Sequence, residues 1–290
     1  MKFVNPRNDV AFRKIFGSQE KSDILISFLN AVLGLQKDKT IQSVQILNPY
    51  QTPKLEKLKT TILDVRATDK RGITFIVEMQ IAYTTGIRKR FTYYLAKAYA
   101  SQIERGEDYP KLNQVFFIGV LDFILFANKG KEKGKNEYTP FHYLSRHQIL
   151  NTETHQQEFK DLELNFIELP HFNKTEKEVT TLLEKWVYFI KHANDLDVIP
   201  EHVDEPALQD AYKTADRFGW GKDDLEAYEY RGIRIQDERG AIEHAFQKGH
   251  QGGRVETAHK MKIKGYDVTE IAELTGLTIE EINALTTKES

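Results

Sequence analysis

Asp64, Glu78 and Gln80 are the residues whose types and spacing best suit chemistry. Two acidic side chains that face each other across paired strands repel, so the arrangement needs a positive partner. A divalent cation such as Mg²⁺ would serve, because one or two carboxylates hold it together with waters and substrate phosphates. Such an ion can polarise a phosphodiester and activate water. The simpler alternative is an exposed polar face on which Arg66 neutralises the acids.

The segment between the two acids predicts a β-hairpin that brings them together. Residues 70–72, Lys-Arg-Gly, suit a three-residue loop that ends on a glycine in the left-handed region. Counted back from that loop, Asp64 lies directly opposite Glu78, and Ile62 lies opposite Gln80. A two-residue loop would put the acids on opposite faces of the sheet. With the three-residue loop, one face is wholly apolar: Leu63, Val65, Ala67, Ile73, Phe75, Val77 and Met79.

Hydrophobic periodicity predicts helices and further strands around this hairpin. Helices are expected at 8–16, 22–33, 86–104, 176–192, 205–218, 223–248 and 254–264, with Asn8 as an N-cap and Gly34 as a stop. Strands are expected at 41–47, 114–121, 138–143 and 162–169. Strands mixed with helices favour an α/β core over a β-barrel.

An ordered set of motifs resembles the PD-(D/E)XK nucleases. Asp64, a thirteen-residue spacer and then Glu78-Met79-Gln80 match the D…E-x-K/Q core of that superfamily. The chain resembles in particular the recombination-promoting nuclease (Rpn) family, also described as PD-(D/E)XK-type transposases. The similar segments are 8–17, the hairpin, 88–94, Gln102, 115–121 and 268–285, and they extend over nearly the whole chain.

This resemblance implies a restriction-endonuclease-like mixed sheet with flanking helices, followed by a helical C-terminal region. It also implies a metal-dependent DNA endonuclease in which Asp64, Glu78 and the main-chain carbonyl of Met79 hold Mg²⁺ or another divalent cation. Gln80 stands where many relatives have lysine, and a neutral amide can only hydrogen-bond. Asp9 would help complete the acidic site; its alternative role is to favour the start of a helix.

Several basic residues are candidates for contacts with DNA. Arg88, Arg90 or Lys97 could supply the cation that Gln80 lacks, and a guanidinium matches the geometry of a phosphate. The candidates for DNA binding are Arg88, Lys89, Arg90, Lys131 and Lys133. The last two belong to a Gly-interrupted lysine loop at 129–135, for which a solvated hairpin tip is the alternative.

Composition restricts the class of protein. The 290 residues are 40% hydrophobic and 29% charged, which is typical of a globular chain. Without cysteine, the chain has no disulfide, thiolate zinc site or cysteine nucleophile, and this suits the cytoplasm. No apolar run is long enough for a membrane span or a signal peptide. Residues 1–170 carry an excess of basic residues and 171–290 an excess of acidic ones, which weakly favours DNA as the partner of the first part.

Three domains are expected: a nuclease domain at 1–170, a helical extension at 171–250 and a small helical tail at 251–290. Three glycines within 249–253 suggest a linker before the tail. The tail has a helix-turn-helix outline, but Glu280 and Glu281 would begin its second helix, where acids disfavour DNA. Packing, dimerisation or partner binding is therefore the other role considered for it.

Two main functions are compatible with these features. The first is the metal-dependent DNA endonuclease, linked to recombination, mobile elements or defence against foreign DNA. It would require no nucleotide cofactor, since no Walker or GxGxxG motif is present. A homodimer would suit the cutting of both strands. The second is a catalytically inactive, transposase-derived protein that binds DNA or a partner. The main reason to consider it is that Gln80 replaces the lysine of many relatives. A purely structural domain with an oligomerising tail is a third possibility.

Overall fold

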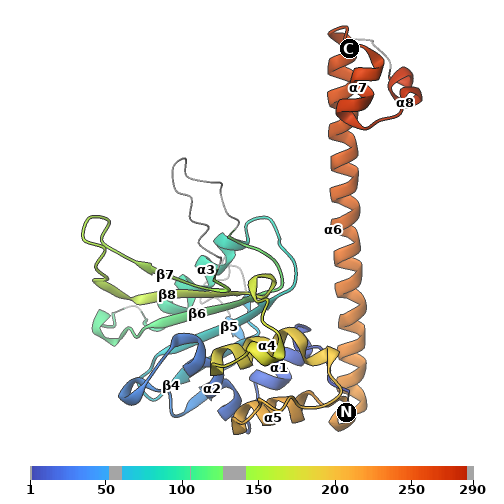
Figure 1. The fold of residues 1–290 in the computed structure, drawn as a ribbon. Helices are drawn as coiled ribbons and strands as arrows, with labels where there is room; N and C mark the ends of the chain where they lie inside the picture. Colours follow the sequence, from blue (N-terminus) through green and yellow to red (C-terminus); the bar gives the residue numbers. More distant parts are fainter. Residues whose placement is uncertain (1, 52–60, 105, 127–141, 286–290) are drawn as a thin grey trace. The chain divides into compact units, whose positions relative to one another are not determined.

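A six-stranded mixed sheet forms the centre of the first compact unit, residues 1–232, in the computed structural model (Figure 1). The structure describes residues 2–51, 61–104, 106–126 and 142–285. The strand order is β1-β4-β5-β6-β8-β7. β5, β6 and β8 run parallel to one another, whereas the β1–β4, β4–β5 and β7–β8 pairs are antiparallel. This confirms the expected mixed-sheet α/β class.

The elements follow the chain in mixed order. The strands are β1 (Val44–Ile46), β2 (Tyr50–Gln51), β3 (Thr61–Ile62), β4 (Val65–Asp69), β5 (Thr74–Gln80), β6 (Val115–Leu121), β7 (Leu144–Ile149) and β8 (Phe159–Glu168). The helices are α1 (Asp9–Phe16), α2 (Ser22–Leu33), α3 (Ile87–Ala100), α4 (Leu182–His192), α5 (Pro206–Ala215), α6 (Lys222–Ile263), α7 (Val268–Thr275) and α8 (Ile279–Ala284). Asn8 caps α1 and Gly34 ends α2 in the left-handed region, as expected.

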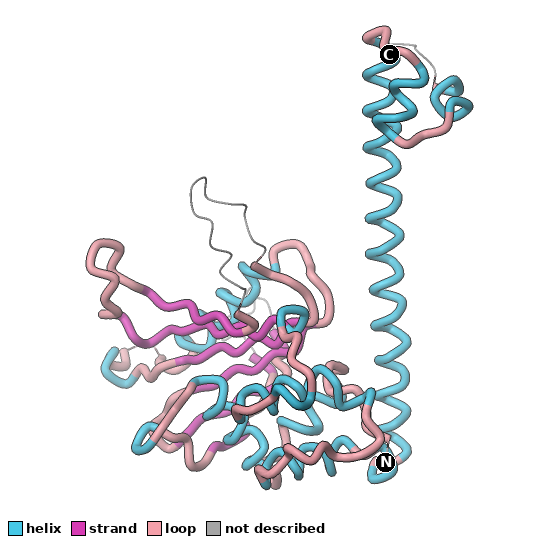
Figure 2. The backbone as a smooth tube through the Cα atoms, viewed as in Figure 1, coloured by secondary structure: helices cyan, strands magenta, loops and turns pink. Residues whose placement is uncertain are grey.

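Helices cover both faces of the sheet, so both faces of the central strands are buried (Figure 2). Val77 packs in a core with α1, α2, α4 and α5, in which Trp186 is fully buried. Ile76, its neighbour on β5, points to the other face and packs against α3 through Phe91. Because alternate residues of a strand point to opposite faces, a strand covered on both sides is apolar along most of its length, and Glu78 and Gln80 at the end of β5 are exceptions.

The β4–β5 hairpin has the predicted loop. Val65 pairs with Val77 and Thr68 with Thr74, and Gly72 adopts a φ of +81°. Two details differ from the expectation. Ile62 pairs with Tyr50 in the short β2–β3 sheet rather than with Gln80. Leu63 packs in the core on the α3 side rather than with the apolar face of the hairpin. The chain bends at Asp64, between β3 and β4, and a bend interrupts the strict alternation of sides.

Other boundaries shift. The strand predicted at 138–143 lies mostly outside the described residues, and β7 begins at Leu144. Residues 171–232 belong to the first unit, where α4 and α5 share one core with the sheet, so no boundary between compact units falls at 170. The predicted linker at 249–253 is wrong, because α6 continues through it as a single helix of 42 residues.

The second compact unit contains residues 233–290. Within it, Ala258 of α6 packs with Ile271, Leu277 and Ile282 in a small core of its own. α7 ends at Gly276 in the left-handed region, and Thr278 caps α8 through a capping box. The helix, tight turn and helix expected for the tail are therefore present. Among the described helices, none combines the length and apolar character that a bilayer span requires.

Candidate active site

The hairpin places the two acids side by side, and main-chain N–H groups of the hairpin hold both carboxylates. The Asp64 N–H donates to Glu78 Oε1 at 3.0 Å, and the Met79 N–H donates to Asp64 Oδ2 at 2.8 Å. Glu78 is 3% exposed, and the Asp64 side chain is 9% exposed. The structure therefore places the predicted pair side by side and removes both carboxyls from bulk water.

Burial and mutual repulsion hold these carboxyls in their neutral form to unusually high pH. The pKa of Glu78 lies well above its ordinary value because the group is desolvated and faces the charge of Asp64. The pKa of Asp64 is also raised, chiefly by burial, although the Met79 N–H and Arg13 act in the opposite direction. Perturbed acids of this kind cluster at functional sites, because the buried apposition of two acidic groups costs stability unless it serves a function.

An arginine that the sequence reasoning did not assign completes one side of the site. Arg13 Nε donates to Asp64 Oδ1 at 3.2 Å, and its Nη2 donates to Asp9 at 3.1 Å. Asp9 also accepts from Arg231 Nε at 2.9 Å. Arg13 and Asp9 lie four residues apart on α1, a spacing that places them on one face of the helix and could have indicated the pair. The cation beside Asp64 is thus Arg13 rather than Arg66.

A second chain of contacts extends from Glu78 to α3. Gln80 Nε2 donates to Glu78 Oε2 at 3.1 Å, and Arg90 Nη2 donates to Gln80 Oε1. Arg90 also lies over the ring of Tyr94, whose hydroxyl pKa is raised by burial and by the charge of Glu78. Gln80 therefore links the acidic pair to a cation from another element.

The other predicted cations lie elsewhere. Arg88 Nη2 donates to the Leu125 carbonyl at 2.5 Å and its guanidinium lies over Phe126, away from the hydrogen bonds of the acid pair. Lys97 Nζ lies over the ring of Tyr93. Lys89 is exposed on the first turn of α3. Lys131 and Lys133 fall outside the described residues. Of the three cations considered beside Gln80, the structure brings Arg90 to it.

The donor set of the acid pair fits a hard divalent cation. Asp64 and Glu78 offer four carboxylate oxygens, each with a second lone pair beyond the hydrogen bond that it already accepts. Among the described residues, no group of three or more acidic, histidine or cysteine side chains lies close enough together to hold a metal. A cation here would therefore depend on the two carboxylates, main-chain oxygen and water, which is the usual environment of Mg²⁺.

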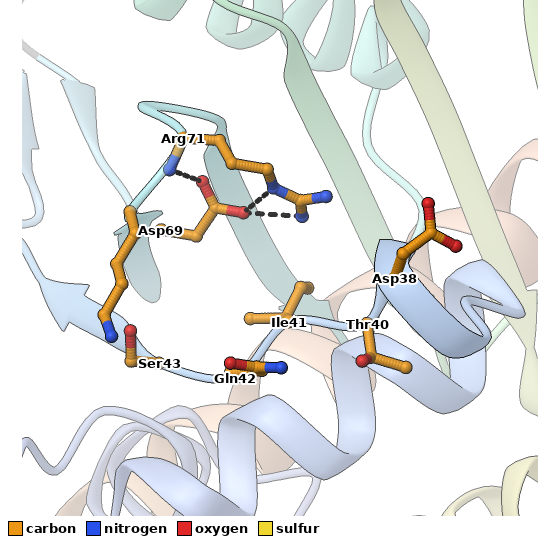
Figure 3. Close-up of a pocket in the computed structure, with 8 residues that line it drawn as sticks. Asp38, Thr40, Ile41, Gln42, Ser43, Asp69 and Arg71 are labelled. Carbon is orange, nitrogen blue, oxygen red and sulfur yellow. Dashed lines mark hydrogen bonds and ion pairs between the residues drawn. The ribbon is translucent and has the colours of Figure 1, made fainter.

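The opposite end of the same hairpin contains another buried aspartate in a different setting. Asp69 accepts from the main-chain N–H groups of Arg71 and Ile73 at 2.9 and 3.1 Å, and Arg71 Nη2 lies 2.6 Å from its carboxylate. Figure 3 shows this carboxylate beside a hollow of about 180 Å³, which Thr40 and Ser43 also line. These contacts stabilise the loop and compensate the charge of Asp69. Asp38 also lines the hollow, but the main-chain and arginine contacts of Asp69 mark it as a loop-stabilising residue.

The fold and the acid pair together define a PD-(D/E)XK nuclease-like protein. The chain belongs to the family described as PD-(D/E)XK nuclease family transposase, whose model matches residues 6–245. The match includes α1, the hairpin and α3, which carry all the residues of the acid pair and its contacts except Arg231, and that residue also lies within it. No curated protein and no solved structure matches the chain. Family membership supports a nuclease-like or transposase-related role, with DNA as the implied substrate and divalent metal ions as the general cofactor of such nucleases.

Proposed function

We propose that this protein is a metal-dependent DNA endonuclease that hydrolyses phosphodiester bonds. The observation that carries the proposal is the direct apposition of Asp64, at the bend before β4, and Glu78, on β5 of a PD-(D/E)XK-type sheet, with Glu78 buried and the Asp64 side chain 9% exposed. Facing like charges destabilise a sheet, and a structural role would be served better by neutral residues. A bound cation would offset the repulsion between the two carboxylates and would explain why both acids are present.

Asp64, Glu78 and the main-chain carbonyl of Met79 would hold the cation, for which Mg²⁺ is the best candidate. When bound, such an ion polarises the phosphodiester, activates water and stabilises the leaving oxygen. The two carboxyls must be ionised to bind it, and their raised pKa values make binding sensitive to mild acidification.

Gln80 and Arg90 would together replace the lysine of other superfamily members. The Gln80 amide N–H orients Glu78 through Oε2, and its carbonyl end accepts from Arg90. A positive charge therefore stays close to the acidic pair without contacting the carboxylates themselves. Arginine keeps its charge at all relevant pH values and can bind a phosphate through two parallel hydrogen bonds. Arg90 is thus suited to stabilise negative charge on the phosphate as its bond breaks.

Asp9 and Arg13 would adjust the other side of the site. Arg13 joins Asp64 to Asp9, and Arg231 anchors Asp9 in turn. The Arg13 side chain is 45% exposed, so it can move from Asp64 towards a phosphate when a cation neutralises the carboxylate. Asp9 would then remain beside Asp64, where it can orient a water molecule.

Cleavage of supercoiled plasmid tests the proposal. The full-length protein should nick or linearise the plasmid with Mg²⁺ and stop when EDTA is added. Asp64→Ala should bind DNA without cutting it, with folding verified by circular dichroism. Asp210→Ala is a matched control, since the Asp210 side chain is paired with Lys213 in an exposed ion pair on α5. Unchanged cleavage by folded Asp64→Ala protein would refute the site.

The alternative is a protein that binds DNA or a partner without turnover. It is considered because position 80 is glutamine rather than lysine. It predicts DNA binding but no cleavage with Mg²⁺, Mn²⁺ or Ca²⁺. If cleavage is found, a role in recombination, mobile elements or defence follows naturally from the transposase-related family. Cutting of both strands would further favour a homodimer, which size-exclusion chromatography with light scattering can measure.

A further inference from the structure

A second hollow adjoins the acid pair at the start of α3. It has a volume of about 400 Å³, within the range of pockets that bind small organic groups. Its lining includes Thr84, Thr85, Lys89, Arg90, Tyr93 and Tyr94. The lining thus combines two cations, two hydroxyl-bearing threonines and two aromatic rings.

Arg90 connects this hollow to the candidate active site. Its Nη2 donates to Gln80 Oε1, and Gln80 donates to Glu78. Tyr94 also lines the hollow, and the Arg90 guanidinium that contacts Gln80 lies 6.0 Å from the centroid of its ring. A ligand in the hollow would therefore lie beside the acid pair rather than at an independent site.

The charges around the hollow favour an anion. Lys89 and Arg90 lie in the opening turns of α3, which has no acidic residue in its first turn and no side-chain cap. Cations at the N-terminal end of a helix oppose its dipole, so this sequence is unfavourable for the helix alone. A phosphate would reverse that effect. Moreover, Arg90 Nε is buried without a hydrogen-bond partner among the described residues, so the guanidinium retains donor capacity.

The aromatic part of the lining favours a base. Tyr93 is 38% exposed although it lies on a helix that packs against the sheet, and Lys97 Nζ lies 5.8 Å from its ring centroid. An exposed aromatic ring beside cations is the arrangement by which proteins bind single-stranded nucleic acid, through base stacking and phosphate contacts together. Inside a paired duplex both faces of a base are covered by its neighbours, so stacking on a side chain costs the unstacking of a base step, whereas an unpaired base can stack without that cost.

We propose that this hollow binds an unpaired nucleotide next to the phosphate to be cut, with its base against Tyr93 and its phosphate between Lys89 and Arg90. The inference rests on the proposed function, because it takes DNA as the ligand. It adds a substrate class: DNA that contains an unpaired nucleotide at the cleavage point, as in single strands, flaps or bubbles.

Binding without cleavage tests this inference separately from catalysis. The probe is a short oligonucleotide carrying 2-aminopurine, either single-stranded or paired with its complement, titrated with full-length Asp64→Ala protein in EDTA. We expect the single strand to bind at least about tenfold more tightly than the duplex and its fluorescence to fall on stacking. In the same background, Tyr93→Ala should weaken single-strand binding by roughly 5- to 150-fold, while duplex binding stays unchanged.

Two matched variants sharpen the result. Tyr93→Phe retains the ring and should bind single strands within about twofold of the parent. Tyr109→Ala removes a tyrosine that is 79% exposed and does not line the hollow, and it should have no effect. Equal affinity for single strand and duplex, or equal losses for Tyr93→Ala and Tyr109→Ala, would overturn the inference. Neither result would affect the plasmid assay, so the proposed function can stand if this inference fails.

Discussion

The two ends of the β4–β5 hairpin each contain a buried aspartate, and they differ in what surrounds the carboxylate. At the loop end, Asp69 accepts from two main-chain N–H groups and from its own arginine, Arg71. At the open end, Asp64 accepts from one main-chain N–H group and from Arg13, and it faces a second carboxylate, Glu78. Burial alone therefore does not distinguish the proposed metal-binding acid from the acid that stabilises the loop. The distinguishing feature is negative charge that the protein leaves only partly neutralised.

The largest expected difference between the two aspartates is in catalysis. Asp64→Ala should lower plasmid cleavage by at least about a thousandfold, since the metal supplies several kcal/mol of stabilisation to the transition state. Asp69→Ala should retain the activity of each folded molecule. Both variants are compared by initial rates, normalised to the folded fraction from circular dichroism. Similar losses in the two variants would mean that the open end of the hairpin is not a catalytic centre.

Arg90 and Arg88 offer the next comparison, because they lie two residues apart on α3 and contact different partners. Arg90→Ala should lower the cleavage rate by about 10- to 100-fold, because it removes the contact that holds Gln80, which in turn orients the proposed metal ligand Glu78. Arg88→Ala removes a hydrogen bond to the Leu125 carbonyl and should leave the rate within about threefold. The measurement is the single-turnover rate with saturating protein. A larger loss in Arg88→Ala would reverse the roles assigned to these two arginines.

The acid pair could be predicted from local sequence spacing, whereas the contacts between separate helices and strands could not be. The loop at 70–72 and the hydrophobic alternation fixed the register of the hairpin, and with it the apposition of Asp64 and Glu78. The bend that turns Leu63 to the other face depends on the β2–β3 pairing and α3, which no local pattern encodes. The contact of Arg90 with Gln80 joins α3 to β5, so sequence spacing alone could not decide which of Arg88, Arg90 and Lys97 lies beside Gln80.

Two further misreadings have physical reasons. Leu144–Ile149 is a polar strand at the edge of the sheet, so it lacks the apolar alternation that marks strands in sequence. The glycines at 249–253 suggested a linker, yet α6 continues through them. Each glycine costs a helix about 1 kcal/mol relative to alanine, and good helix formers on both sides can outweigh that cost.

Asp69 should dominate the stability of the hairpin, in contrast to its small effect on catalysis. Asp69→Ala leaves the N–H groups of Arg71 and Ile73 without their acceptor, which should cost about 1–2 kcal/mol of unfolding free energy. The adjoining hollow admits water, and this limits the loss (Figure 3). Asp69→Asn keeps one acceptor oxygen and should lose less. Urea unfolding of the three proteins measures the difference, and an unchanged midpoint for Asp69→Ala would contradict the structural role.

The smallest expected effect is a gain in stability when the acidic pair is broken without metal. Asp64→Asn keeps an oxygen for the Met79 N–H and removes one of two facing charges, so it should raise the unfolding free energy by up to about 1 kcal/mol at about pH 8 in EDTA. Folding raises the pKa values of both carboxyls, so the native protein binds more protons than the unfolded chain at intermediate pH. The wild-type protein therefore becomes more stable as the pH falls through those raised values.

The gain from Asp64→Asn should accordingly shrink as the pH falls through the raised pKa values of the pair, because protonation relieves the same repulsion in the wild-type protein. Added Mg²⁺ should abolish or reverse the gain, because the cation stabilises the wild-type pair and has no equivalent site in the variant. Asp69→Asn provides the contrast, since Arg71 and two main-chain N–H groups already compensate the charge of Asp69 and no gain is expected. A pH-independent gain at Asp64, or an equal gain at Asp69, would show that repulsion between the two acids is not what separates the ends of the hairpin.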